Sequence, residues 1–189
     1  MTNNATYQRK SHNGVPAFIE GESFRKMQLR IMIRLFARAL EVEAPSVKRM
    51  SADDLLYTFA QFSATEIAVA LSDEDGGARK ANRLYEKAMA LGKKLRLLPP
   101  LRNADPFALT SALYRNIDIG LHGCLPGDLT MCPCYFSSYY TPRICQFMKA
   151  FDTGIMSGIA GKGNLEFTDR ISQGAPACHA HFALEGEGK

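Results

Sequence analysis

The residues of this chain that are best suited to chemistry lie in its last third. All five cysteines follow residue 123, and two of the four histidines come within three residues of the last cysteine. Thiolates attack electrophilic carbon and bind soft metals, and imidazole transfers protons near neutral pH. We therefore expect a module after residue 123 whose thiols bind a metal, attack a substrate or pack in the core. The cysteines are Cys124, Cys132, Cys134, Cys145 and Cys178, and the two histidines are His179 and His181.

The cysteine spacing matches the common zinc motifs poorly. A single residue separates Cys132 from Cys134, whereas structural zinc sites usually place two or more residues between paired ligands. Four thiolates would be available only if the fold brought Cys145 and Cys178 to that pair. The sequence therefore specifies no cofactor, and a divalent metal such as zinc stays an alternative to free thiols. Core packing is the competing interpretation for Cys132 and Cys134.

Cys145 and Asp152 are expected to share one face of a helix. Thr141 followed by Pro142 is typical of a helix start, and seven residues span about two turns. In the first turns of this helix, Cys145 would gain from the positive end of the helix dipole, which lowers the pKa of a thiol. Asp152 would orient a base or a water. Alternatively it forms a structural ion pair, because a buried carboxylate needs a partner; Arg143 and Arg170 are the candidate partners.

Four helical segments precede this module and must position it. Apolar residues recur at helical spacing over residues 22–42, 55–71, 78–97 and 107–121. The second segment is apolar on several faces, which predicts a central position for it. The acidic and glycine-rich residues 73–77 are predicted to break the chain between the second and third helices.

The module itself is predicted to be mostly extended. We expect a strand near residues 129–135, strands at 164–172 and 177–184, and a hairpin turn at 173–176. Alternation places Cys178 on one face of the last strand, and His179 and His181 on the other. The predicted fold class is therefore α+β, with N-terminal helices packed on a small antiparallel sheet that has a C-terminal β-hairpin.

Length and composition favour one domain. The chain has 189 residues with an ordinary hydrophobic share of 46%. We expect a flexible arm at 1–14, a single domain at 15–184 and a tail at 185–189. The domain would have a helical part at 15–123 and a cysteine-containing module at 124–184. The start is unlike a secretory signal and no apolar run is long enough for a membrane span, so we expect a cytoplasmic protein with reduced thiols.

The positive charge is concentrated near the start of the chain. Residues 1–50 hold nine Lys or Arg against four Asp or Glu, and the net charge of the whole chain is +4. Arg30, Arg34 and Arg38 fall on one face of the first predicted helix. No recognisable nucleic-acid-binding motif accompanies them, so a solvated face is favoured over a nucleic-acid surface. The expected partner is a small-molecule substrate or ligand, no membrane partner is expected, and a homodimer is an open alternative.

Several ordered positions of the last third form a pattern. It runs through Cys132-Pro133-Cys134-Tyr135-Phe136, then Ile144-Cys145 to Asp152, then Leu165 to Arg170, and then Gly174 through Cys178 to Phe182. This pattern resembles the L-2-amino-thiazoline-4-carboxylic acid hydrolase family. The hairpin ending in a cysteine also looks like the small-molecule-binding domains of the 4-vinyl-reductase group.

Two positions depart from the family pattern. Family members often carry a second cysteine shortly after the Ile-Cys pair, where this chain has Gln146 to Lys149. The residue after the hairpin cysteine is often acidic, and here it is His179. Both departures fall at the expected site, so the chain is either a divergent member with another substrate or one that has lost ring hydrolysis.

The resemblance implies hydrolysis of a cyclic amidine-like C=N or a related C–N bond in a small substrate. Either a thiolate adds to the electrophilic carbon or a metal activates water. A non-catalytic binding or sensory module and a structural protein are the alternatives. The expected catalytic residues are Cys145, Asp152 and Cys178, and the expected substrate contacts are Cys132, Cys134, Tyr135, Arg143, Arg170 and His179, with an arginine holding a carboxylate.

Overall fold

The structure is a computed structural model that describes residues 15–186, apart from the side chains of residues 74 and 75. The predicted arm at 1–14 and the last three residues of the predicted tail lie outside this range. The described chain is an α+β fold, as the sequence predicted. Its α-helices are α1 (Glu22–Leu40), α2 (Ala52–Ala70), α3 (Glu74–Leu97), α4 (Pro106–Arg115) and α5 (Pro142–Ala160). Its strands are β1 (Ile119–Gly123), β2 (Gly127–Cys134), β3 (Gly163–Asp169) and β4 (Cys178–Leu184), and short 3-10 turns lie at Ala17–Glu20, Pro99–Leu101, Tyr135–Ser138 and Ile171–Gln173.

Local capping fixes the starts of three helices where the sequence predicted them. Ser51 and Asp54 form a reciprocal capping box at the start of α2. Asp105 caps α4 through the Ala108 N–H, with a proline at the first helical position. Thr141 likewise caps α5 by accepting a hydrogen bond from the Ile144 N–H. These starts depend on neighbours in sequence, so sequence alone identifies them.

The predicted break at residues 73–77 is wrong in part, because α3 already begins at residue 74. Asp73 caps the helix by accepting a hydrogen bond from the Gly76 N–H at 3.0 Å. A Cβ on Gly77 would lie 2.9 Å from the Ala70 carbonyl oxygen of the preceding helix. The glycines therefore allow α3 to start directly against the end of α2 rather than breaking the helix.

The helix predicted for residues 107–121 is also too long. It ends at Arg115, and Asp118 adopts a left-handed conformation with φ of 55° before β1 begins. In β1, Ile119 and Leu121 are buried, and Gly120 between them approaches β2 so closely that a Cβ would lie 2.3 Å from the Cys132 carbonyl oxygen. Pairing with β2 thus overrides the helical pattern of the local sequence.

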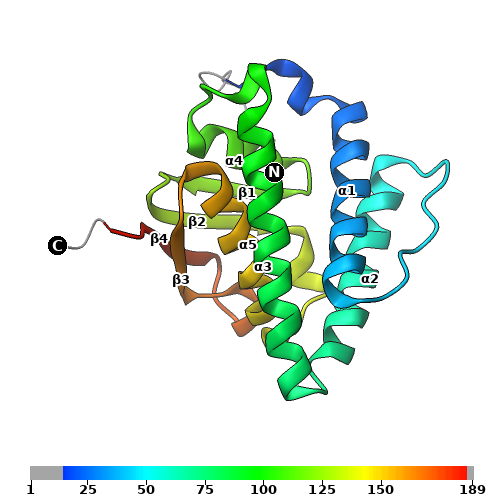
Figure 1. Ribbon diagram of the computed structural model, residues 1–189. Helices are drawn as coiled ribbons and strands as arrows, with labels where there is room; N and C mark the ends of the chain where they lie inside the picture. Colours follow the sequence, from blue (N-terminus) through cyan, green and yellow to red (C-terminus); the bar gives the residue numbers. More distant parts are fainter. Residues whose placement is uncertain (1–14, 187–189) are drawn as a thin grey trace, which may run out of the picture.

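The four strands form one antiparallel sheet in the order β1-β2-β4-β3. The predicted strand near residue 129 pairs with the last strand, with Met131 opposite Cys178 and Thr130 opposite His179. The predicted C-terminal hairpin is the β3–β4 pair. Figure 1 shows the sheet on one side of α5 and α3 on the other, with α1 and α2 beyond. The sheet therefore has one face on the helices and one face open to solvent.

The sequence predicted a central position for α2, but the central helix is α5. Every residue from 153 to 159 of α5 is buried, whereas α2 leaves Tyr57 and Val69 more than half exposed. Three glycines bring α5 against α3: a Cβ on Gly92 would lie 2.6 Å from the Ile155 oxygen, and a Cβ on Gly158 2.3 Å from the Met89 oxygen. A Cβ on Gly154 would lie 2.4 Å from the Tyr85 oxygen.

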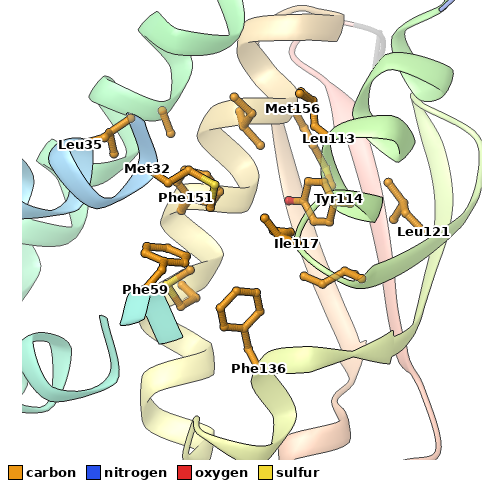
Figure 2. Packing of buried hydrophobic residues seen from close by; sticks show 14 of the residues in the cluster. Met32, Leu35, Phe59, Leu113, Tyr114, Ile117, Leu121, Phe136, Phe151 and Met156 are labelled. Carbon is orange, nitrogen blue, oxygen red and sulfur yellow. The ribbon is translucent and has the colours of Figure 1, made fainter. Parts of the chain in front are cut away.

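Aromatic side chains fill the core between α5, α1 and α2 (Figure 2). Phe36 packs edge-on against Phe59 with ring centroids 5.0 Å apart, and it meets Phe151 of α5 at 5.3 Å. Phe136, which follows β2, packs edge-on against Phe59. This core fixes α5 relative to the sheet and so positions the residues of the site. Among residues 15–186, no helix has both the length and the apolar character needed to cross a membrane.

Candidate functional site

A cluster of polar and sulfur-containing side chains lies where α5 faces the sheet. It consists of Tyr114, Cys134, Cys145, Asp152, Arg170 and Cys178, and is called the α5–sheet cluster below. The charge of Asp152 raises the pKa of all three thiols, which shows that these groups lie close together. The fold thus brings together five of the expected site residues, namely Cys134, Cys145, Asp152, Arg170 and Cys178, and adds Tyr114.

Asp152 has the most perturbed carboxyl group of the cluster. Burial raises its pKa to about 6, and the Tyr114 hydroxyl and the Arg170 charge offset part of this effect. The Tyr114 hydroxyl donates a hydrogen bond to Asp152 Oδ1 at 2.5 Å. A carboxyl group that titrates near 6 exchanges protons readily at neutral pH, which is the property of a general acid–base.

Tyr114 is a site residue that the sequence analysis missed. It lies in α4 and is 2% exposed, and Figure 2 shows its hydroxyl directed toward α5. Burial raises its pKa well above the ordinary value, and the charge of Asp152 and their hydrogen bond add to the effect, so the hydroxyl stays a donor. The sequence did contain one signal for it: a tyrosine on the apolar face of a predicted helix. A buried tyrosine hydroxyl needs a hydrogen-bond partner.

The three thiols of the cluster are protonated at neutral pH. Burial raises the pKa of Cys145, and the nearby Ser172 hydroxyl and the Arg170 charge offset only part of that rise. Burial raises the pKa of Cys134 to about 12, and it also raises that of Cys178, although the Ile171 N–H donates to its Sγ at 3.3 Å. The prediction that the start of α5 lowers the pKa of Cys145 is therefore wrong, because desolvation outweighs the helix dipole.

Arg170 supplies the positive charge of the cluster. Its guanidinium carbon lies 4.4 Å from the centre of the Phe167 ring, so the cation stacks on the end of β3. Its charge lowers the pKa of Asp152, Cys145 and Cys178. It forms no salt bridge within 4.0 Å among the described residues, so its donors remain free for an anionic group.

Arg143, the other expected carboxylate binder, lies away from the cluster. Its Nη2 donates to the Leu71 carbonyl oxygen at 3.4 Å. It lines an open depression of about 740 Å³ with Gln146 and Phe147 at the starts of α3 and α5. Of the two arginines that the sequence offered as partners of Asp152, Arg170 is near enough for its charge to lower the pKa of that carboxyl group, but it forms no salt bridge with it.

The histidines face solvent on the outer side of the sheet. His179 Nδ1 lies 3.2 Å from the Thr130 hydroxyl, and His181 Nδ1 pairs with Asp128 Oδ1 at 2.7 Å. Both side chains are exposed, whereas Cys178 between the sheet and α5 is buried. The predicted strand parity is confirmed, and the expected substrate contact from His179 is wrong for this cluster because its side chain lies on the opposite face.

Cys132 and Tyr135 lie at the margins of the cluster. Cys132 is exposed and its thiol donates to the Pro176 carbonyl oxygen at 3.6 Å. Tyr135 packs on Tyr139 with ring centroids 5.3 Å apart and hydroxyl oxygens 3.2 Å apart, which together with burial raises its pKa to about 12. Aromatic packing therefore describes Tyr135. Cys124 is exposed in the turn after β1.

The described part of the chain contains no assembled set of metal ligands. No three His, Cys, Asp or Glu residues within it are grouped so that they could hold a metal ion. All five cysteines are free thiols. The cluster is therefore described by its carboxyl group, its cation and its protonated thiols.

No protein-family model matches this chain, and no significant match was found to any curated protein or solved structure.

Proposed function

We propose that this protein is a hydrolase that opens a cyclic amidine-like or related C–N bond of a small carboxylated substrate, with Asp152 as the general acid–base. The observation that carries this proposal is the Asp152 carboxyl group, whose pKa of about 6 results from burial beside Tyr114 and Arg170. Strongly perturbed carboxyl groups with a specific charge partner are concentrated at functional sites. The family resemblance of residues 132–182 supports the same reaction class.

Each side chain of the cluster has a role in this reaction. Arg170 binds the substrate carboxylate through paired N–H donors. Tyr114 holds Oδ1 of Asp152, which leaves Oδ2 to accept a proton from water. As that proton moves, the water oxygen bonds to the carbon, the π electrons of C=N pass to the nitrogen, and Asp152 gives the proton to that nitrogen. Asp152 then carries the proton of the new hydroxyl group to the same nitrogen as the C–N bond breaks and C=O forms, so the carboxylate is regenerated.

Water attack is preferred to thiolate attack because the Cys145 thiol lacks a group that deprotonates it. Burial raises its pKa, and Asp152 raises it further instead of accepting its proton. The thiols then act as neutral, polarisable walls of the site. The buried Ser172 hydroxyl lies near the Cys145 thiol and has no hydrogen-bond partner at bonding distance among the described residues, so it can bind a substrate atom.

Turnover of carboxylated cyclic amidines, followed by mass spectrometry, tests this proposal. Asp152→Asn is expected to lower kcat by roughly 100-fold or more, in the range of lost general acid–base catalysis. Asp169→Asn is the matched control, because Asp169 is an exposed carboxylate at the end of β3. Cys145→Ala is expected to retain kcat within a few fold. Full activity of Asp152→Asn, or no turnover by the unchanged protein on cyclic amidines and small amides, would contradict the proposal.

The second candidate is a non-catalytic small-molecule-binding or sensory module. The protonation of all three thiols of the cluster favours it, because a site without a thiolate nucleophile suits ligand binding as well as water activation. This function predicts that small carboxylates raise the melting temperature while remaining unchanged. Arg170→Gln should remove the stabilisation, and Arg143→Gln, which alters the separate depression, should keep it.

A further inference from the structure

A narrow apolar groove lies between α1 and α3 and shares only Tyr114 with the α5–sheet cluster. Its empty space of about 490 Å³ includes the open mouth, and only about 50 Å³ is wide enough for the centre of a water molecule, so the groove is narrow. Nearly all its lining side chains are apolar; the walls include Met27, Ile31, Leu91 and Leu95, and the floor includes Tyr114 and Phe151. A ligand with a slender apolar chain would fit this lining.

The mouth of the groove exposes large apolar side chains to solvent. Met27 is 46% exposed and Ile31 is 37% exposed, although both belong to a helix whose opposite face is buried in the core. The floor lies deeper, since Tyr114 and Phe151 come from α4 and α5 beneath the two helices and are almost fully buried. The groove is therefore recessed, and a bilayer surface could not reach its floor.

The apolar stripe of α1 continues into basic residues. Met27, Ile31, Arg34 and Arg38 recur at intervals of three or four residues and so lie on one helix face. Arg34 and Arg38 are exposed and form no salt bridge among the described residues. The basic residues that the sequence placed on one helix face thus lie beyond one end of the groove.

The facing helix adds positive charge at the same end. Arg83 pairs with Glu41 at the C-terminal end of α1, whereas Leu91 and Leu95 line the groove with residues of the first half of α1, so α3 runs antiparallel to α1. Arg83, Arg79 and Lys80 all lower the pKa of Glu41, which is consistent with a positive local field. Lys87, one turn from Leu91 on α3, therefore lies on the side of the groove where α1 carries Arg34.

The two helices together carry most of the positive charge of the protein. Five Lys or Arg in α1 oppose one Glu, and seven in α3 oppose three Asp or Glu. The pair thus holds a net charge of +8 in a chain whose total is +4. An apolar groove that leads into such a surface is complementary to a molecule with an apolar chain and a negative head.

We infer that this groove binds a single-chain anionic amphiphile, with its alkyl chain between α1 and α3 and its carboxylate near Arg34 and Lys87. A partner helix, roughly 10 Å across with its side chains, is too wide for a groove of this volume and depth. The inference concerns a different surface from the proposed hydrolase site, and it holds whether or not that site is catalytic.

Titration of the full-length protein with decanoate, dodecanoate and tetradecanoate below their micellar concentrations, followed by calorimetry, tests the inference. Each added pair of CH₂ groups is expected to tighten Kd by roughly tenfold while the chain remains inside the groove, since each buried CH₂ contributes about three- to fourfold. Dodecanol should bind at least tenfold more weakly than dodecanoate. Arg34→Glu should weaken dodecanoate binding at least tenfold and leave dodecanol binding unchanged.

Lys48→Glu is the matched control, because it reverses an exposed charge in the loop after α1 and should leave dodecanoate binding intact. Circular dichroism of both variants checks that the fold is retained. The inference is overturned if dodecanoate does not bind, if Arg34→Glu binds it as well as the unchanged protein, or if binding is seen only to vesicles of phosphatidylglycerol. Sedimentation that shows a dimer disrupted by Ile31→Glu would assign the groove to a second copy of the chain and overturn it as well.

Discussion

Asp152 illustrates at the scale of one residue how a site can cost stability. Its carboxyl group has only one hydrogen bond from a side chain and lies among thiols and aromatic rings, so its charged form is poorly solvated. The folded protein therefore binds the Asp152 proton more tightly than the unfolded chain does. By linkage, the contribution of Asp152 to stability decreases as pH rises from about 4 to about 6 and stays low above that range.

Asp152→Asn is accordingly expected to raise the free energy of unfolding at pH 7 and to change it much less at pH 4. The amide oxygen can still accept the Tyr114 hydrogen bond, and the cost of a buried charge is removed. The shift of Asp152 from 3.8 to about 6 limits this gain to about 3 kcal/mol, and about 1–2 kcal/mol is expected after relaxation. Urea unfolding at both pH values measures it. Asp169→Asn should show no such pH dependence, and equal effects of Asp152→Asn at both pH values would refute the assignment.

The thiols should differ sharply in their reactivity toward an alkylating reagent. Cys124 and Cys132 are exposed, so iodoacetamide is expected to modify them first in the native protein at pH 7.5. Cys134, Cys145 and Cys178 should react at least tenfold more slowly, because burial keeps them protonated and restricts access. Peptide mass spectrometry after timed quenching gives each rate, with the urea-unfolded protein as the reference. Rapid native modification of Cys145 would restore the thiolate mechanism.

At the scale of elements, the contact between α3 and α5 determines where the site can form. Gly92 of α3 and Gly158 of α5 lie so close that each approaches the backbone of the other helix. This close approach fixes α5, and α5 in turn carries Cys145 and Asp152 to the inner face of the sheet. Larger residues at the contact would move both side chains away from β2 and β4.

Gly158→Ala is expected to destabilise the protein although alanine is the better helix former. The new methyl would lie 2.3 Å from the Met89 oxygen and 2.8 Å from the Gly92 Cα, and both are backbone atoms that cannot move freely. Overpacking of this kind costs about 1–3 kcal/mol, which exceeds the gain of about 1 kcal/mol in helix propensity. Thermal unfolding measures the difference. Lys93→Ala, an exposed change beside Gly92, should leave the melting temperature within about 2 °C. A stabilised Gly158→Ala variant would show that the helices separate easily.

The elements that the sequence predicted well are those with local determinants. Thr141 and Pro142 start α5 through their own neighbours, and the alternation at Cys178 assigns the faces of β4 from sequence alone. The strand at Ile119 was missed because its pairing partner lies across a turn and its glycine serves a tertiary contact. The central role of α5 was missed for a similar reason, since the close approach of Gly154 and Gly158 to α3 is a tertiary contact.

The candidate site was predictable in part for the same physical reasons. Helical periodicity placed Cys145 and Asp152 on one face, and strand parity directed Cys178 inward. The partner of Asp152 and the state of the thiols depend on burial, which no local pattern specifies. Tyr114 and Arg170 reach the cluster from α4 and from the end of β3, which are far apart in sequence.

At the scale of the whole molecule, one side chain connects the two sites. The ring of Tyr114 lies in the floor of the groove between α1 and α3, and its hydroxyl holds Asp152 in the α5–sheet cluster. The groove and the cluster are thus separated by α5 and joined through a single aromatic residue. A change at Tyr114 should therefore alter the protonation of Asp152 without removing any group that touches the substrate.

Tyr114→Phe is expected to move the acid limb of the kcat/KM profile to higher pH. The lost hydroxyl stabilises the Asp152 carboxylate, so its removal favours the protonated acid and raises its pKa above about 6. A hydrogen bond to a charged group contributes about 1.5–3 kcal/mol, and a shift of roughly one unit is expected after partial replacement by water. Tyr140→Phe is the matched control, because it removes another buried hydroxyl, bonded to Ser63 at 2.6 Å, that does not contact Asp152. An unshifted acid limb in Tyr114→Phe, or an equal shift in Tyr140→Phe, would show that the Tyr114–Asp152 hydrogen bond does not set the pKa of the catalytic group.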